Sequence, residues 1–596
     1  MSIIIGTSAN DQLLSTSSDD QIDGGAGVRD VLTYKGSFSE FDISFNSATN
    51  SFRIADTVPN RNGVDIVTGV EIFRWTLPFP FGPEKKSGEL SNDQYVHVVN
   101  SDFTIIPHWI GTISFAADVR PLPYWINTLM EPEWSDNIIA ERLGPQNTYY
   151  FSFPDQYPEY GSHQVWSGDY VPFTTEQKAI MREKIAEVSV FLGVNFVETD
   201  NYNALNTMAI HQNSNLPHDG LGAGPLGQLE SNDLLMSSKI TSADRWLLVF
   251  VHELGHTLGL SHPHEGNAGG LSKLEDSQIW SIMSYAGPPE GEPNRWLDSF
   301  TDPDIAALQY LYGPNPLSRA TDDVYSVSVD SPNFIWDGAG NDTLTAAHLN
   351  QSAVIHLEPG YWDYIGEKGI GINTNGQITI NIGTTIENLI GGSGEDFLYG
   401  NALPNEITGG PGNDFIDGGI GIDTAFFNGN RSDYSVVVTS SEYTVSGNDG
   451  IDTLTGIERI NFDDGKYAFD VSGNAGNAAK LVGALIGPNS ATDPFYIGLV
   501  LSYLDSGTEY EDLMQIALDA VLGPQATSQS VVSHLHSNIF GSQASQEFLD
   551  EYSKLIDSGS MTAAQLGVAA ANSSLNEDNI GLIGMTQTGI EYLPYG

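Results

Sequence analysis

The chain has 596 residues, enough for three to five domains, and its 76 acidic and 23 basic residues give a formal net charge of −53. This charge argues against nucleic acid or an anionic membrane as a partner, because both need a basic face, and it suits a protein with many bound cations. The absence of cysteine excludes disulfides and an inhibitory cysteine ligand to a metal. No apolar run approaches 18 residues, so no transmembrane helix is expected, and the first residues do not have the pattern of a Sec signal peptide.

The first 75 residues carry short repeats. Residues 6–32 divide into three nonapeptides, each with an aspartate near its sixth place and an apolar residue two positions later. The third nonapeptide has one residue too many before Asp30, so we expect poor calcium binding there. Residues 63–71 parallel residues 450–458 in sequence. We therefore interpret residues 1–75 as a β-rich module, a diverged copy of one near the other end of the chain.

Residues 76–120 contain several prolines and a β-prone run, and we interpret them as a linker with a short β element. One hypothesis is that this segment covers a cleft of the next domain before activation. Residues 121–314 mix expected strands and helices and form the predicted catalytic domain. Within it we expect an amphipathic helix over residues 174–192, an edge strand at 234–236 that lies alongside substrate, and a helix over 244–258.

The last of these helices carries the chemistry. His252 and His256 lie four residues apart, so a helix points both imidazoles at one spot. Gly259 can adopt the left-handed conformation that ends a helix, and the chain can then bring His262 to the same place. A catalytic zinc ion keeps three protein ligands and one open position. Glu253 lies beside the first ligand, close enough to take a proton from a zinc-bound water.

The motif His-Glu-x-x-His-x-x-Gly-x-x-His is the signature of the metzincin metallopeptidases. Residues 281–285, Ser-Ile-Met-Ser-Tyr, resemble the methionine turn of the serralysin family, and residues 304–313 also resemble the serralysins. The resemblance covers residues 121–465. It implies that Met283 is structural, and that Tyr285 binds zinc in the resting enzyme and stabilises the oxyanion when substrate binds. We expect two other nearby histidines, His218 and His264, to be bystanders.

Residues 315–470 carry a second, repeated pattern. Four nonapeptides of the form Gly-Gly-x-Gly-x-Asp-x-apolar-x run from residue 391 to 426 and resemble the parallel β-roll repeats of RTX proteins. Their glycines permit tight turns, while aspartate and carbonyl oxygens suit Ca²⁺. The second repeat has Asn405 in place of aspartate, so its site should be weaker, and an isolated repeat precedes them at 337–342. The predicted calcium-site residues are Asp342, Gly391, Gly392, Gly394, Asp396, Gly409, Gly410, Gly412, Asp414, Gly418, Gly419, Gly421 and Asp423.

Residues 474–596 change character and are predicted to form an all-α module. Six helical segments are expected, near 477–486, 494–505, 509–522, 529–539, 543–557 and 562–571. Serralysins leave the cell through a type I exporter that reads an uncleaved C-terminal signal. The resemblance implies the same route here, although residues 591–596 only partly fit the usual ending of one acidic and three apolar residues.

Together these observations predict a multidomain protein: an α+β metzincin catalytic domain, a parallel β-roll (RTX) domain, an N-terminal RTX-like module and a helical C-terminal module. The resemblance implies a secreted bacterial zinc endopeptidase that acts on polypeptides, with one catalytic zinc ion and several structural calcium ions. Glu253 would act as general base and then general acid, and Tyr285 would stabilise the oxyanion. The alternative is a calcium-stabilised extracellular adhesin or matrix protein with a vestigial or narrowly specific protease domain.

Overall fold

The fold is taken from a computed structural model, and every structural statement below refers to the residues that it describes. These are residues 2–5, 12–14, 20–23, 31–34, 41–46, 51–56, 64–68, 72–75, 95–99, 105–109, 123–130, 143, 147–156, 170–204, 207–214, 216, 219–222, 233–264, 271–272, 274–287, 297–439 and 442–595. Asp30, His218 and most of residues 76–120 lie outside them, so the expectations about their roles have no structural counterpart here.

The N-terminal strands form two five-stranded sheets. The first has the order β1 (Ser2–Ile5), β3 (Asp20–Asp23), β7 (Val64–Thr68), β6 (Ser51–Asp56) and β5 (Phe41–Asn46). The second has the order β10 (Ile105–Trp109), β9 (Tyr95–Val99), β8 (Ile72–Trp75), β4 (Val31–Tyr34) and β2 (Gln12–Leu14). Strands β1, β3 and β7 run parallel, as do β2, β4 and β8. Ile22, Leu32, Ile54 and Val67 are buried.

The same arrangement recurs near residue 450. There, β28 (Ser435–Val438), β29 (Tyr443–Ser446) and β30 (Ile451–Thr455) form an antiparallel run, as β5, β6 and β7 do. In both copies the last strand of the run pairs in parallel with a strand of a preceding repeat. Strand β30 pairs with β26 (Phe415–Asp417), and β7 pairs with β3. The two segments that are parallel in sequence therefore fold alike.

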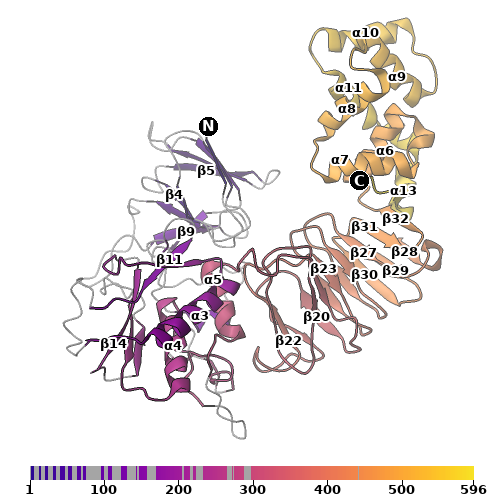
Figure 1. The fold of residues 1–596 in the computed structure, drawn as a ribbon. Coiled ribbons are helices and arrows are strands. Elements are labelled where there is room, and N and C mark those ends of the chain that lie inside the picture. Colours follow the sequence, from indigo (N-terminus) through magenta and orange to yellow (C-terminus); the bar gives the residue numbers. More distant parts are fainter. Residues whose placement is uncertain are drawn as a thin grey trace.

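The segment around the histidine motif is a mixed sheet covered by helices (Figure 1). The sheet has the order β13 (Asn195–Glu198), β11 (Thr148–Ser152), β14 (Thr207–Asn213), β16 (Leu234–Ser237) and β15 (Gly220–Gly222), and β12 (Tyr170–Val171) also pairs with β14. The helices are α1 (Tyr124–Asn127), α3 (Thr175–Phe191), α4 (Ala243–Thr257) and α5 (Asp302–Tyr312). One apolar cluster joins sheet and helices, with Phe250, Leu254 and Met208 fully buried.

The expected edge strand at 234–236 is wrong. Strand β16 is bonded on both sides, parallel to β14 and antiparallel to β15, and its residues are buried. The edge of the sheet is β15, whose sequence Gly-Leu-Gly has little intrinsic preference for a strand. It forms because β16 offers it a free row of backbone groups.

Residues 324–468 form a β-roll of two facing sheets. One has the order β17 (Val324–Ser326), β19 (Thr343–Thr345), β23 (Asn388–Ile390), β25 (Glu406–Thr408), β27 (Thr424–Phe426), β31 (Arg459–Phe462), β32 (Gly465–Ala468) and β33 (Ile590–Tyr592). The other has the order β18 (Asn333–Ile335), β22 (Gln377–Ile380), β21 (Asp363–Ile365), β20 (Ala353–His356), β24 (Phe397–Tyr399), β26, β30, β29 and β28.

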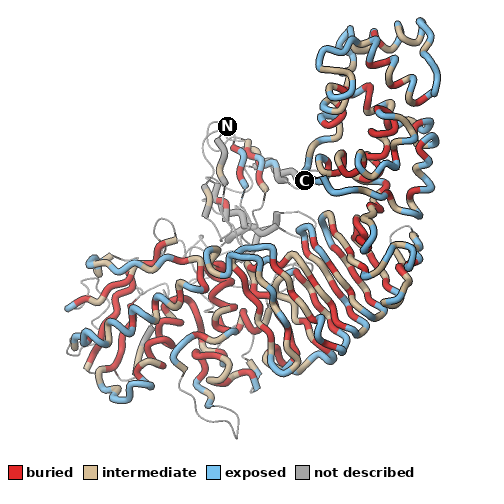
Figure 2. Tube along the Cα trace, turned by 45° about the vertical axis from the view of Figure 1, so that its right-hand side comes forward, coloured by how far each residue is buried: buried red, intermediate tan, exposed pale blue. Residues whose placement is uncertain are grey.

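The roll is built from the predicted nonapeptides. Its eighth-place residues, Leu398, Ile407, Ile416 and Ala425, are at most 1% exposed and alternate between the two sheets. Figure 2 shows such buried positions recurring from turn to turn. Gly410 illustrates why the turns need glycine: its φ is +97°, and a Cβ there would overlap the carbonyl oxygen of Gly392 in the adjacent turn.

The C-terminal part is a set of short helices stacked on the end of the roll (Figure 1). They are α6 (Asn474–Leu485), α7 (Pro494–Asp505), α8 (Tyr510–Leu522), α9 (Ser528–Phe540), α10 (Gln546–Asp557), α11 (Ala563–Ala571), α12 (Ser574–Ile580) and α13 (Leu582–Thr588). The expectation of an all-α module is wrong in one respect. Strand β33 follows α13 and pairs with β32, so this part completes a sheet of the roll.

The roll also contacts the segment that holds the histidine motif. Trp362 of the roll packs against Tyr124 and Trp125 of α1, with ring centroids 5.7 and 6.2 Å away. The buried Glu275 carboxylate accepts hydrogen bonds from the Tyr124 hydroxyl and from the backbone N–H of Ile372. No helix among the described residues is long and apolar enough to cross a membrane.

Candidate metal centres

Helix α4 positions the first two histidines. It begins at the N-cap Ser242, whose hydroxyl accepts from the backbone N–H of Arg245. It ends just before Gly259, whose φ of +103° is the left-handed conformation that the sequence predicted. The chain after the helix is held by a bridge between Leu260 and Met130, and it then brings His262 back toward the helix.

The three histidines converge as expected. The Nε2 atom of His262 lies 3.2 Å from that of His252 and 3.0 Å from that of His256. Two neutral imidazole acceptors at this distance repel each other, so the arrangement requires a shared cation or proton. Ligands at about 2.05 Å from a tetrahedral zinc ion lie about 3.3 Å apart, close to these separations.

Backbone carbonyls fix the orientation of the rings. The Nδ1–H of His252 donates to the carbonyl of Ile282 and that of His256 to the carbonyl of Leu260, each at 2.8 Å. Nε2 is thereby left as the metal-binding atom of both rings. Burial lowers the pKa of His252 to about 4, and burial with the two neighbouring imidazoles lowers that of His256 to about 3. Both rings are therefore neutral at pH 7, which is the form that binds a metal.

Glu253 lies against the edge strand of the sheet. Its side chain is 8% exposed, and a Cβ placed on Gly220 of β15 would lie 2.6 Å from the carboxylate Oε1 atom. The carboxylate is thus held between α4 and the backbone of β15, next to the first histidine of the cluster. A glycine in β15 is required for this close approach.

The methionine turn packs beneath the histidines. Met283 is fully buried, and its sulfur occupies the space that a side chain on Gly255 of α4 would need, with a separation of 2.5 Å from such a Cβ. Asp304 of α5 holds the turn: it accepts from the Ser281 hydroxyl at 2.6 Å and from the Ile282 N–H at 2.9 Å. The backbone of Ile282 therefore links Asp304, through its N–H group, to His252, through its carbonyl group.

Tyr285 lies over the cluster. Its ring centroid is 4.4 Å from that of His262 and 5.4 Å from that of His252, and its side chain is 63% exposed. The structure thus brings Tyr285 together with the three histidines. His264 is not one of the three histidines whose ligand atoms converge, although its ring stacks on His262 at 5.3 Å and lies 5.4 Å from that of Tyr285.

The predicted calcium residues line the turns of the roll. The N–H of Asp396 donates to the carboxylate of Asp414, 18 residues later, and the N–H of Asp414 donates to Asp452, both at 2.9 Å. On the other sheet the N–H of Asp423 donates to Glu458 at 2.9 Å. Asp414 and Asp423 thus bind the backbone of the adjacent turn with one carboxylate oxygen and keep the other for the space between turns. Asp396 differs, because its two carboxylate oxygens accept from the N–H groups of Ala353 and Gly392, each at 2.7 Å.

The second oxygen is the one that needs a cation. The Oδ2 atoms of Asp414 and Asp423 are buried without a hydrogen-bond partner. Burial, with nearby carboxylates adding to it, raises the pKa of each to about 7. Asn405 differs, because its amide nitrogen donates to the carbonyl of Glu387 at 3.0 Å and to Asn401 at 3.1 Å. Carboxylate and carbonyl oxygens in such turns suit Ca²⁺.

The isolated repeat forms a further acidic cluster. Asp337 and Asp342 are buried and come together with Asp323, so that one carboxylate oxygen of each lies within 4.8 Å of the others. Burial raises the pKa of Asp337 to about 7, and the hydroxyl of Tyr325 donates to its carboxylate.

The Glu387 carboxylate also belongs to the roll site, because it accepts from the Asp342 N–H at 2.7 Å. Asp342 was predicted from the sequence as a site residue, but Asp304, Asp323, Asp337, Glu387, Asp452 and Glu458 were not. The internal repeat could have indicated Asp452 and Glu458, since both lie in the segment that parallels residues 63–71. The parallel is structural as well: the N–H of Asp20 donates to Asp65 at 2.9 Å, as that of Asp414 does to Asp452.

Three segments of the chain match models of known families. Residues 306–483 match a family model described as the C-terminal domain of the M10 serralysin peptidases. Residues 203–309 match a reprolysin-like metallopeptidase family, M12B. Residues 3–28 match the RTX calcium-binding nonapeptide repeat. The segments with the zinc motif and the repeats are thus recognised independently of one another.

Several curated proteins that are similar to part of this chain are metallopeptidases. A serralysin of Proteus mirabilis is 36% identical over 184 residues, which are 27% of this chain and 36% of that protein. Metalloprotease AprA of Pseudomonas entomophila is 35% identical over 184 residues, 26% of this chain and 37% of that protein. Serralysin C of Dickeya chrysanthemi is 36% identical over 173 residues, 25% of this chain and 35% of that protein. The chain spans just over a third of the length of these relatives, and within that span it is similar to serralysin-type metallopeptidases with RTX calcium-binding repeats.

Proposed function

We propose that this chain is a secreted zinc-dependent endopeptidase whose β-roll is stabilised by calcium. The observation that carries the proposal is the convergence of three imidazole Nε2 atoms, two of them oriented by backbone carbonyls, beside the buried carboxylate of Glu253. Three ligands leave one coordination position open, as a catalytic zinc site requires. The similarity to serralysins and to a reprolysin-like family supports it.

Each residue of the site has a proposed role. His252, His256 and His262 would hold the zinc ion, which when bound acts as a Lewis acid toward the peptide carbonyl and a water molecule. Glu253 takes a proton from the attacking water and later gives it to the leaving amine. Tyr285 donates a hydrogen bond to the developing oxyanion. Met283 supports the histidines from below.

The domain division proposed from the sequence assigns this chemistry to residues 121–314. Residues 315–470 would bind structural calcium through their aspartates, and residues 1–75 would form a second, smaller RTX-like module. Residues 76–120 connect these parts, and their strands β9 and β10 extend the second N-terminal sheet beyond the proposed boundary at residue 75. Residues 474–596 form the helical C-terminal module. Millimolar extracellular calcium would neutralise the turns of the roll, so that folding is coupled to export. Polypeptide substrates and a type I secretion system are the proposed partners.

The test is casein cleavage at millimolar Ca²⁺ by the full chain and by its Glu253→Ala variant, with the zinc content of both measured. We expect cleavage by the unsubstituted chain, none by the variant, and one zinc ion per chain in each, because Glu253 is not a ligand. Equal cleavage by both proteins would refute the role of Glu253. Absence of zinc from both would refute the metal site itself.

The alternative is a calcium-stabilised adhesin with a vestigial or narrowly specific protease domain. It predicts normal zinc binding without cleavage of casein. A library of unrelated peptides separates its two forms: a narrowly specific enzyme cleaves some of them, and a vestigial domain cleaves none. The intact set of Glu253, Tyr285 and the three histidines favours the active enzyme.

A further inference from the structure

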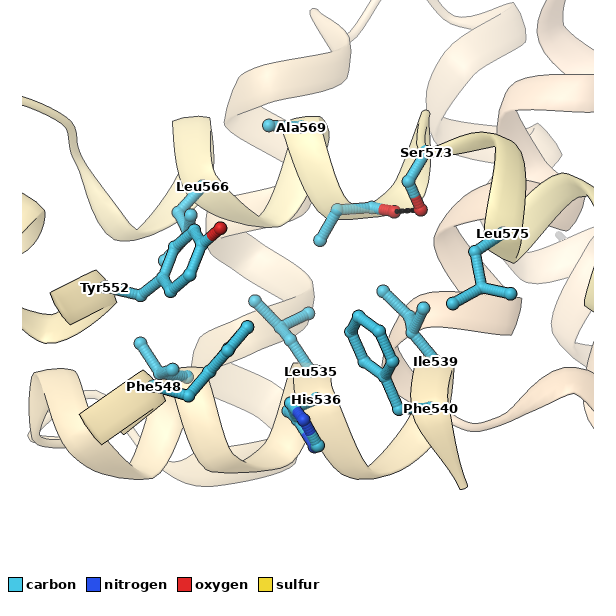
Figure 3. A pocket seen from close by; sticks show the side chains of 12 residues that line it. Leu535, His536, Ile539, Phe540, Phe548, Tyr552, Leu566, Ala569, Ser573 and Leu575 are labelled. Carbon is cyan, nitrogen blue, oxygen red and sulfur yellow. Dashed lines mark hydrogen bonds between the residues drawn. The ribbon is translucent and has the colours of Figure 1, made fainter. Parts of the chain in front are cut away.

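The helical C-terminal part contains a pocket that the proposed reaction does not use. It has a volume of about 250 Å³ and lies between α9, α10, α11 and α12. Figure 3 shows Phe540 and Phe548 on either side of the opening, with Leu535 between them, Tyr552 and Leu566 on one side and Leu575 on the other. The wall of the pocket is mostly apolar, with His536, Tyr552 and Ser573 as its polar members.

Aromatic rings form a continuous row along one side. Phe548 stacks on Tyr552 with centroids 4.3 Å apart, and His536 lies 4.7 Å from Phe548 and 4.5 Å from Phe540. The row is not fully covered: Phe540 is 52% exposed, and Leu575, on the same side of the pocket in Figure 3, is 38% exposed. Large apolar side chains left open around a concave surface are typical of a binding site.

The helices around the pocket are acidic. Residues 528–580 carry six carboxylates and one lysine, Lys554. Glu551 lies three positions after Phe548 on α10, and Glu547 lies four positions before Glu551, so helical spacing places both along the edge that carries the aromatic residues. Both glutamates are exposed. An occupant thus meets an apolar cavity with negative charge beside it.

The charge and the volume of the pocket indicate which kind of molecule can bind in it. A second copy of this chain carries a net charge of −53 and would be repelled. The volume is below the range of about 300–1,000 Å³ that is usual for drug-sized ligands, and it suits one large side chain. Glutamates at the rim favour an occupant that also carries cations.

We propose that this pocket binds a basic polypeptide segment that inserts a large apolar side chain. The pocket lies in the module at the other end of the roll from α4 (Figure 1), so the bound segment is anchored away from the histidine cluster. Binding does not depend on peptidase activity, and the proposal can fail or hold independently of the proposed reaction.

The test is fluorescence anisotropy with the full chain in millimolar Ca²⁺, carrying Glu253→Ala so that the probe stays intact. The probe is a labelled amphipathic peptide of lysine and leucine with one tryptophan. Two matched probes replace lysine by glutamate, or leucine and tryptophan by alanine. We expect only the first probe to bind, with an affinity that falls as salt is raised.

Substitutions then locate the site. Phe540→Ser should weaken binding at least tenfold, as loss of a central aromatic contact does. Glu547→Gln with Glu551→Gln should weaken it several-fold at low salt and reduce the salt dependence. Phe495→Ser is the matched control, because Phe495 of α7 is 49% exposed and does not line the pocket, and it should change binding less than twofold. Circular dichroism and thermal midpoints check that each variant is folded.

Three results would overturn the proposal. The basic probe could fail to bind, the acidic probe could bind equally well, or Phe540→Ser could have no more effect than Phe495→Ser. The first would exclude a basic polypeptide, the second would exclude the role of charge, and the third would place binding elsewhere on the chain.

Discussion

Replacing Asp304 should disturb the histidine cluster although Asp304 is not one of its residues. The Asp304 side chain is fully buried and accepts from the Ser281 and Thr301 hydroxyls and from the N–H groups of Ile282 and Thr301. The Ile282 carbonyl in turn orients His252. Asp304→Ala removes the acceptor from all four donors and frees the Ile282 peptide to move.

The magnitude follows from the two backbone N–H groups. The hydroxyls can rotate toward other acceptors, as that of Thr301 does toward the Trp280 carbonyl. The N–H group of Ile282 would remain buried and that of Thr301 half-buried. An unsatisfied buried donor costs about 1–3 kcal/mol and a half-buried one costs less, so Asp304→Ala should lower local stability by about 2–4 kcal/mol. Asp304→Asn keeps an oxygen for both N–H groups and should cost about 1 kcal/mol.

Hydrogen exchange measures this effect where it occurs. In the zinc-free protein with calcium, the peptide that covers residues 277–287 should exchange about 30-fold faster or more in Asp304→Ala, since 1.4 kcal/mol is a factor of ten. Zinc affinity, measured by chelator competition, should fall about 10- to 100-fold, as it does when a group that orients a ligand is lost.

A control substitution and a comparison of the two Asp304 variants test this explanation. Asp298→Ala removes a carboxylate that is 65% exposed and should leave both measurements unchanged. The reasoning is refuted if Asp304→Ala and Asp304→Asn have equal effects, because the number of satisfied N–H groups would then not matter. It is also refuted if exchange accelerates while zinc affinity stays the same, since Ile282 would then not orient His252.

Three other predictions follow from the packing and the charges. Gly255→Ala should destabilise the chain by about 1–3 kcal/mol and lower zinc affinity, because the new methyl group would overlap the sulfur of Met283; thermal unfolding and chelator competition measure the two effects. Arg459→Ala should destabilise the contact between roll and helical part by about 3–5 kcal/mol, since its buried guanidinium binds two carboxylates; faster limited proteolysis between the two parts is the readout. In chelator, the pKa of about 7 at Asp414 and Asp423 means that the folded roll binds protons more tightly than the unfolded chain, so its stability should fall as pH rises from about 4 to 7; circular dichroism at pH 5 and pH 8 tests this, and calcium should abolish the difference.

The histidine cluster could be predicted because its geometry is local. His252 and His256 share one helical face, and Gly259 supplies the turn that returns His262, so the eleven residues 252–262 define the site. The roll could be predicted for a related reason: its period of nine residues repeats one local structure. Six of the eight helices described in the C-terminal part lie within a few residues of their predicted positions, since caps such as Thr527 act on their own first turn. The two short helices α12 and α13 were not predicted.

What the sequence did not reveal depends on pairing between distant segments. The edge strand β15 has two glycines in three residues and exists only because β16 lies beside it. Asp304 reaches Ile282 across 22 positions, and nothing in the local pattern links them. Asp323 and Asp337 meet Asp342 only after the roll has closed. In each case contacts between distant segments determine the structure, and the local sequence says little about it.

The pairing of β32 with β33 sets an order of events for this chain. Lys466 pairs with Tyr592, and the whole helical part lies between them in sequence. The turns of the roll can stack one by one, because each turn contacts the next. Strand β33 is separated from β32 by more than a hundred residues, so the two strands can pair only when the helices between them bring them together. Completion of this sheet is therefore a slow, long-range step that requires an intact C-terminal part.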